Sequence, residues 1–345
     1  MDFSKFYKKL PKRIRQSDSL TYYAVNFSTK FHNFFKSKNE EKDPFLNFLF
    51  KSTNLKAEGN FRNVQLLALE LLKFIDNVCK KYDLQYFIIY GSLLGAVRHG
   101  GFIPWDDDLD IMMMRKDYNK LIEILPYEIN KNEYLKHNLG LTLLNNINDN
   151  YFEDTNHILD EDYINHFLAN DSEKSRFLQL GCLKPLAKLD IFPFDYIKDD
   201  FVQVYDKKYR SQKFIFRNAY FDKEFSYFNE LTKRSKKLGL TLEKTNFIGE
   251  GLDATYWDDF GHIDADLFFP ISKIKFEGFE FMSPNKPMEL LKFWYGENYM
   301  DIPSDLDIHN FNDFNKKFYN SDEEINRAFI ETINELKNIN EHFND

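Results

Sequence analysis

The pattern of apolar and polar positions is most regular between residues 61 and 99. Apolar residues recur at helical spacing from Phe61 to Tyr82 and predict an amphipathic helix that we expect to serve packing alone. The next apolar run, 86–90, is short, β-branched and aromatic, which favours a buried strand. Gly91-Ser92 ends this run, and Ser92 is expected to cap a short helix over 93–99. The pattern therefore predicts a strand, a turn and a helix in succession.

An acidic segment leads into a second predicted strand. Asp106–Asp108 immediately precede the largely apolar run 109–114. Residues two apart on a strand share a face, so Asp108 and Asp110 should point toward one spot while the apolar residues beside them face the core. Two carboxylates are thus expected next to the turn at Gly91-Ser92.

The remaining apolar patterns predict the scaffold around these strands. Helices are expected at 115–125, twice within 201–239, at 287–295 and at 321–340; strands at 139–144 and within 181–196; and a hairpin at 273–281. The polar segment 145–173 has no clear period and is either a loop on the substrate side or a variable insertion. Loops are expected at 249–251 and 256–259. This order of elements predicts an α/β (α+β) fold in which helices flank a mixed central sheet.

Composition limits the function classes that remain. The chain has 345 residues, of which 43% are apolar, enough for a sizeable core. A net charge of −9 argues against a nucleic-acid polymer as the main partner. Cys79 and Cys182 lie far apart in the sequence, which excludes a CxxC metal site and argues against a disulfide framework. No apolar run is long enough to span a membrane, so we expect a cytoplasmic protein.

The first 38 residues are basic in an otherwise acidic chain. They contain nine Lys and Arg against Asp2 and Asp18, with aromatic residues interleaved. This pattern suits either an amphipathic arm on an anionic membrane surface, peripheral at its inner face, or a solvated extension. We therefore expect an N-terminal extension at 1–58 and one catalytic domain at 59–345.

The acidic residues predict a cation. Neighbouring carboxylates raise each other's pKa unless a cation lies between them, and hard oxygen ligands suit Mg²⁺ or Mn²⁺. The turn at Gly91-Ser92 begins a helix, where outward N–H groups can hold a phosphate. A phosphate-holding turn beside an Asp-x-Asp strand is typical of metal-assisted phosphoryl or nucleotidyl transfer. An acidic surface loop or a Ca²⁺ clamp is the alternative for Asp108 and Asp110.

Three segments resemble one enzyme family. Gly91-Ser92 followed by Asp108-Leu109-Asp110 resembles the nucleotidyltransferase-fold signature, and GSLLGAVRHGGFIPWDDDLDI at 91–111 resembles the LicD family, whose wider relatives include fukutin and fukutin-related protein. The segments KLDIFPFD at 188–195 and FPISKIKFEG at 269–278 are also similar to that family. Together the resemblance covers roughly residues 60–305.

The resemblance implies roles for individual residues. Asp190 corresponds to a third acidic residue of the active site, and the implied metal ligands are Asp108, Asp110 and Asp190. Asp106 is a further catalytic candidate with three alternative roles: a metal ligand, a general base, or a residue that supports the metal ligands. Gly91 and Ser92 are the candidate phosphate-binding residues of the family's turn, and the positions of Arg98 and Lys188 in the sequence add these two as further candidates. Arg98 equally suits a salt bridge at the end of its helix, and His99 is a candidate base.

A substrate class also comes from the resemblance. It implies a Mg²⁺- or Mn²⁺-dependent transferase that moves phosphocholine from CDP-choline, or a similar CDP-alcohol donor, to a sugar hydroxyl of a cell-surface glycan such as lipopolysaccharide or teichoic acid. Two alternatives stay within enzymes: a ribitol- or glycerol-phosphate transferase, and an NTP-dependent nucleotidyltransferase. A third alternative is a non-catalytic glycan- or membrane-associated binding protein.

Overall fold

The computed structural model describes residue 47 and the ranges 56–142, 177–182, 184–217, 224–254, 261–303 and 315–343. The basic arm at 1–38, the polar segment 145–173 and the loop expected at 256–259 lie outside these residues. The division between an extension at 1–58 and a domain at 59–345 therefore stays a prediction.

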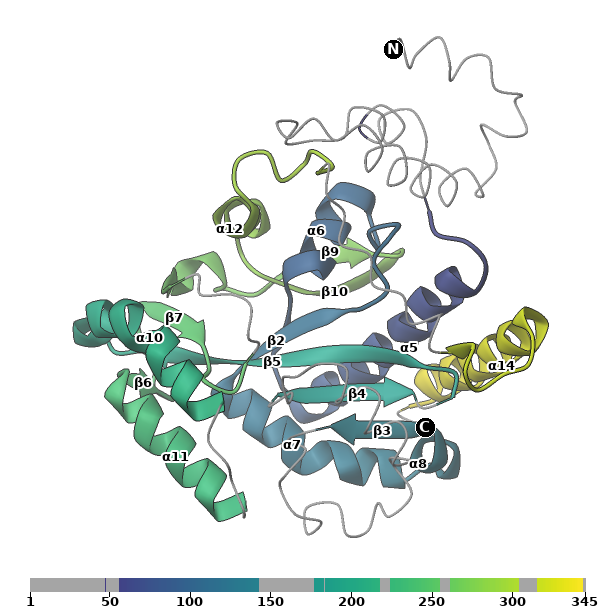
Figure 1. Cartoon of the computed structure of the whole chain (residues 1–345), viewed down its shortest axis with the longest axis horizontal. Coiled ribbons are helices and arrows are strands. Elements are labelled where there is room, and N and C mark those ends of the chain that lie inside the picture. The colour runs from purple at the N-terminus through teal and green to yellow at the C-terminus, as the bar shows by residue number, and fades with distance from the viewer. Residues whose placement is uncertain are drawn as a thin grey trace.

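A mixed eight-stranded sheet forms the centre of the molecule (Figure 1). Its strands are β1 Phe87–Ile88, β2 Asp110–Met114, β3 Leu139–Thr142, β4 Leu178–Cys182, β5 Ala187–Ile197, β6 Leu240–Thr241, β7 Phe247–Glu250 and β8 Ile263–Asp264. The order β1-β2-β5-β4-β3 forms the main path, β6 and β7 pair with β5, and β8 pairs with β7. Among these pairs only β2 and β5 run parallel. The expected mixed sheet flanked by helices is confirmed.

Helices and a separate hairpin surround this sheet. The helices are α5 Gly59–Tyr82, α6 Tyr90–His99, α7 Arg115–Asn130, α8 Glu133–Asn138, α10 Val202–Arg217, α11 Glu224–Lys237, α12 Pro287–Tyr295 and α14 Asp322–Glu341, and the hairpin strands are β9 Ser272–Phe276 and β10 Phe279–Ser283. The predicted helices and the hairpin are confirmed. At α14 the Ser321 hydroxyl accepts a hydrogen bond from the backbone N–H of Glu324, as its capping sequence favours. No described helix is both long and apolar enough to cross a membrane.

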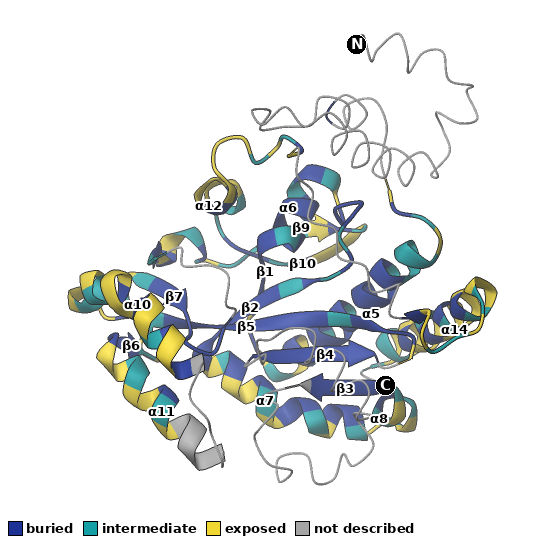
Figure 2. Cartoon of the chain, viewed as in Figure 1, coloured by how far each residue is buried: buried dark blue, intermediate teal, exposed yellow. Residues whose placement is uncertain are grey.

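Burial follows the apolar pattern (Figure 2). The inner strands are buried, and the apolar face of α5 packs on β4 and β5 while α14 packs on α5. A smaller apolar cluster joins α10 and α11 to the end of β5 through Ile197, Tyr205, Tyr209 and Leu231. Cys79 and Cys182 are both buried free thiols.

The prediction of a loop at 249–251 is wrong for the first two of these residues. Gly249 and Glu250 belong to β7, where they pair with Asp195 and Phe194 of β5. A Cβ at Gly249 would lie 2.3 Å from the Tyr205 hydroxyl. This glycine therefore allows a helix to approach a strand closely, and it does not mark a turn.

The turn between β9 and β10 fastens the hairpin to the rest of the fold. Glu277 and Gly278 have positive φ angles of 49° and 86°, as a tight two-residue hairpin turn requires. The Glu277 carboxylate accepts hydrogen bonds from both Arg62 Nη atoms at 2.6 and 3.1 Å and from the backbone N–H of Phe102 at 3.2 Å. The Glu277 side chain, at a turn position that favours glycine, thus links the hairpin, α5 and the segment after α6.

Substituting Glu277→Gln should destabilise the protein by about 1–3 kcal/mol, because a charge-assisted pair is lost from a partly buried position. Burial alone would raise the pKa of Glu277, but the Arg62 guanidinium and the Phe102 N–H hold that pKa below its ordinary value. Its stabilisation is therefore complete above the unfolded pKa of about 4.3 and is lost as the pH falls through the folded pKa. Urea unfolding of both proteins should show the difference at pH 7 and a smaller one at pH 3. A constant difference would contradict the ion-pair explanation.

Candidate active site

Three carboxylates meet where β2 and β5 lie side by side. The parallel register places Asp110 opposite Asp190. Asp108 lies two residues before Asp110, which is the first residue of β2. Asp108, Asp110 and Asp190 each offer one oxygen, and these oxygens lie within 4.8 Å of one another. Leu109 and Ile111 are fully buried on the opposite side, as predicted. The structure thus brings the three expected metal-ligand candidates together.

The first turn of α6 contains Gly91 and Ser92 and lies against this cluster, so the separate turn expected before the helix is wrong. Helix α6 begins at Tyr90 after the N-cap residue Ile89, so Ser92 lies in the first turn and does not cap the helix. The Ser92 hydroxyl instead accepts a hydrogen bond from the backbone N–H of Asp110 at 2.8 Å. The expected role of Ser92 as N-cap is therefore wrong, because a partner on the neighbouring strand occupies the hydroxyl. This bond ties the start of α6 to the acidic strand.

Gly91 has no room for a side chain beside the acidic cluster. A Cβ at this position would lie 2.9 Å from Asp106 Oδ2 and 3.9 Å from Asp110 Oδ2. Substituting Gly91→Ala should therefore displace the Asp106 carboxylate and lower turnover by about 10- to 100-fold, while the displaced side-chain end keeps the cost in stability small. Steady-state kinetics and thermal unfolding would check both expectations. Wild-type turnover in a folded Gly91→Ala protein would show that the position of Asp106 is unimportant.

The acidic residues perturb one another strongly. Burial, followed by the charges of Asp108 and Asp110, raises the pKa of Asp106 well above its ordinary value. Burial and the charge of Asp108 also raise the pKa of Asp190, although Lys188 and Gln179 oppose this shift. These carboxylates hold more negative charge than their surroundings compensate, which favours a cation at this position.

Lys188 lies at the edge of the same cluster. Its Nζ is 2.7 Å from Asp190 Oδ2 and 3.9 Å from Asp108 Oδ2. Burial would lower the pKa of Lys188, but the two carboxylates raise it above its ordinary value, so the side chain is an ammonium. Lys188 is therefore a cation within reach of any group that binds between the acids.

The donor set fits a hard divalent cation. Its three ligand candidates are carboxylate oxygens on two adjacent strands, and no sulfur or imidazole joins this group among the described residues. Such all-oxygen sites suit Mg²⁺ or Mn²⁺, which also keep positions for water and phosphate. Both the chemistry and the crowding of negative charge fit the expected cofactor, which stays a prediction.

Arg98 and His99 are engaged in packing at the end of α6. The Arg98 guanidinium donates to the carbonyl oxygens of Tyr299 and Asp301, both at 3.1 Å, and to His99 Nε2 at 2.9 Å. Burial lowers the pKa of Arg98 to about 10. Burial and the neighbouring Arg98 charge lower the pKa of His99 to about 2. This environment makes His99 a weak proton acceptor, and it gives Arg98 backbone partners instead of the helix-end salt bridge considered above.

Two glutamines support the site and were not predicted from the sequence. Gln65 on α5 donates to the carbonyl oxygens of Ile103 and Asp106 at 3.1 and 2.7 Å, so α5 does more than pack. Gln179 on β4 donates to Asp190 Oδ1 at 2.9 Å. A polar residue within the apolar face of a helix was an available signal for Gln65. The position of Gln179 depends on strand register, which the local sequence does not reveal.

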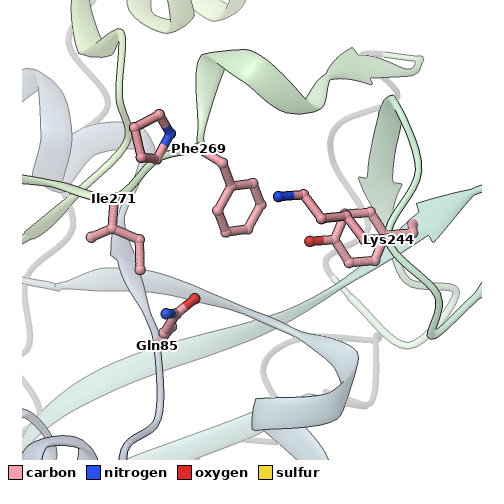
Figure 3. A pocket seen from close by; sticks show the side chains of 6 residues that line it. Gln85, Lys244, Phe269 and Ile271 are labelled. Atoms are coloured by element: carbon pink, nitrogen blue, oxygen red, sulfur yellow. The ribbon is translucent and has the colours of Figure 1, made fainter.

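A separate pocket lies at the other end of β5. Figure 3 shows Gln85, Lys244, Phe269 and Ile271 around a shared space. Its volume is about 550 Å³, and Tyr196 and Pro270 also line it. Tyr196 follows Asp190 by six residues on the same strand, a separation of about 20 Å. This pocket therefore contains none of the acidic residues and belongs to a different part of the surface.

The part of the chain that contains the acidic cluster is similar to known proteins. Residues 83–235 match the family model described as the nucleotidyltransferase domain of LicD, FKTN and FKRP. A 63-residue stretch is 41% identical to the lipopolysaccharide cholinephosphotransferase LicD of Haemophilus influenzae, covering 18% of this chain and 24% of that protein. A 48-residue stretch is 40% identical to the human ribitol 5-phosphate transferase FKRP, covering 14% of this chain and 10% of that protein.

A longer match is more distant. The uncharacterised protein RT0683 of Rickettsia typhi is 26% identical over 193 residues, which cover 52% of this chain and 61% of that protein. The chain thus spans less than two thirds of each of these relatives. The matched region contains the strand, turn, helix and acidic strand described above, as the resemblance of the sequence to the LicD family implied. Residues 83–235 of this chain are thus similar to the nucleotidyltransferase domain of LicD, FKTN and FKRP.

Proposed function

We propose that the chain transfers a phospho-alcohol group from a CDP-activated donor to a sugar hydroxyl of a cell-surface glycan and releases CMP. The observation that carries the proposal is the convergence of Asp108, Asp110 and Asp190 beside the turn at Gly91-Ser92. The family match supports a transferase, and the two named relatives act with cholinephosphate and ribitol 5-phosphate. Because a stretch of this chain is similar to the cholinephosphotransferase LicD, phosphocholine is the first donor group to test.

The three carboxylates would hold Mg²⁺ or Mn²⁺, which neutralises charge on a diphosphate and helps to align it. Backbone N–H groups at the start of α6 would bind a phosphate oxygen of the donor. The Lys188 ammonium would offset further negative charge on the donor. With these groups in place, the protein would favour in-line attack by a bound hydroxyl.

Asp106 is the best-placed acceptor for the hydroxyl proton. It lies beside Gly91 and is partly buried, and its raised pKa would make the carboxylate, once ionised, a stronger base. The proton would go to a carboxylate oxygen of Asp106 as the hydroxyl oxygen attacks the phosphorus that bears the alcohol and the bond from that phosphorus to the departing CMP breaks. Lys188 and the amide of Gln179 would meanwhile keep Asp190 oriented.

Comparing donors tests this proposal. Purified protein with Mg²⁺ should release CMP from one of CDP-choline, CDP-ribitol and CDP-glycerol when a glycan acceptor is present, and a variant carrying Asp108→Asn and Asp110→Asn should not. Turnover of CTP with pyrophosphate release would instead indicate nucleotidyl transfer from an NTP. Binding without turnover of any donor would favour the non-catalytic alternative and would overturn the proposal.

A further inference from the structure

Tyr90 adopts a backbone conformation that its side chain disfavours. It is the first residue of α6 and has a φ angle of +45°. A bulky residue other than glycine at positive φ is strained, and such strain persists only where the surroundings enforce it. Since the next two residues are Gly91 and Ser92, the strain lies directly before the two residues for which a phosphate-binding role was predicted.

A buried carboxylate holds the Tyr90 side chain. The Tyr90 hydroxyl donates a hydrogen bond to Glu250 Oε1 on β7. Glu250 is 6% exposed, and its other oxygen accepts from Lys213 Nζ at 3.0 Å and from the Tyr209 hydroxyl at 3.3 Å. Lys213 Nζ also donates to the Tyr209 hydroxyl at 2.9 Å. The anchor for Tyr90 is thus an ion pair between a strand and α10, outside the acidic cluster.

Aromatic packing fixes the ring from two further sides. The ring centroid of Tyr90 lies 4.7 Å from that of Trp294 on α12 and 5.9 Å from that of Phe192 on β5. Phe192 follows Asp190 by two residues and therefore shares its face of the strand. The same side chain is consequently held by β7, α12 and the strand that carries the third acid.

We propose that Tyr90 is a positioning residue, held by Glu250, that sets the start of α6 so that the turn at Gly91-Ser92 can hold a diphosphate. Gly91 lies against Asp106, and Ser92 accepts from the Asp110 backbone, so a small rotation at Tyr90 would move both contacts. This inference rests on the proposed function only in taking the turn as the phosphate site. It does not depend on which alcohol the donor carries.

Inorganic pyrophosphate is the probe that tests it. In calorimetric titrations at saturating Mg²⁺, Tyr90→Phe should weaken pyrophosphate binding by about 10- to 100-fold, because the turn loses its enforced geometry. Tyr86→Phe is the matched control: the Tyr86 hydroxyl is also buried and donates to a carboxylate, Asp76 Oδ1 at 2.8 Å, but it does not contact the turn. Tyr86→Phe should lower the melting temperature similarly and leave pyrophosphate affinity unchanged.

Glu250→Gln provides a second, independent variant. Like Tyr90→Phe, it should weaken pyrophosphate binding. The double variant should lose less binding free energy than the sum of the two single losses, because both residues act through one contact. Unchanged affinity in Tyr90→Phe, an equal loss in Tyr86→Phe, or no pyrophosphate binding by the wild type would each overturn the proposal. Intact pyrophosphate binding without CMP release would count against the proposed function alone.

Discussion

Asp108→Asn should lower transferase activity by about 10³-fold and at the same time raise the melting temperature of the metal-free protein by about 2–4 °C. The activity falls because Asp108 supplies one of three oxygens that lie within 4.8 Å of one another. The stability rises because the charge of Asp108 raises the pKa of both Asp106 and Asp190, and an amide removes that repulsion. Opposite signs for the two effects are typical of a site in which negative charge serves binding and opposes folding.

Turnover and thermal unfolding in EDTA, each repeated with added Mg²⁺, would measure both effects. Saturating Mg²⁺ should stabilise the wild type more than Asp108→Asn, since only the wild type retains all three carboxylates. Asp266→Asn is the control for the loss of one negative charge, because Asp266 is exposed and its carboxylate pairs with a surface lysine, Lys286. A variant that loses stability in EDTA as well as activity would contradict the charge-repulsion argument.

Arg115→Met should destabilise the fold by about 3–5 kcal/mol, because it leaves two buried carboxylates without their cation. The Arg115 guanidinium donates to Asp195 at 3.0 and 2.9 Å and to Asp253 at 2.7 and 2.6 Å. Asp195 and Asp253 are 5% and 3% exposed. The arginine opens α7, and its partners lie on β5 and just after β7, so its loss disconnects three elements at once.

Urea unfolding of Arg115→Met and the wild type would test this expectation. Lys120→Met is the matched control on the same helix, since Lys120 pairs with Glu123 on the exposed surface, where an ion pair contributes little. Lys120→Met should leave the free energy of unfolding nearly unchanged. If both variants unfold at the same urea concentration, the buried pair contributes no more than an exposed one.

The local sequence predicted the elements of the site well. The order of strand, helix and acidic strand between residues 86 and 114 follows from short apolar runs, but the helix begins at Tyr90 and includes the Gly91-Ser92 pair that was expected to form a separate turn. The alternation of Asp108, Leu109 and Asp110 correctly predicted which side chains face the core. These features depend on neighbours in the sequence, and local propensities and periodicities describe such neighbours directly.

The remaining features depend on contacts between distant residues. Ser92 has a suitable side chain for an N-cap, yet a strand eighteen residues later provides its partner. Gly249 suggested a loop because glycine is common in turns, whereas here it makes room for Tyr205. Gln179 faces Asp190 only because β4 and β5 pair in one particular register. Sequence alone gives no measure of such register or of the space between elements.

The parallel pairing of β2 with β5 has a consequence for how activity arises during folding. Asp110 and Asp190 meet only after two strands separated by a long stretch of chain have joined, and closing such a loop is entropically costly. Recovery of activity after dilution from denaturant should therefore lag behind the return of helical circular dichroism. During synthesis on the ribosome, a nascent chain that has not yet exposed β5 would carry the first two acids and remain inert.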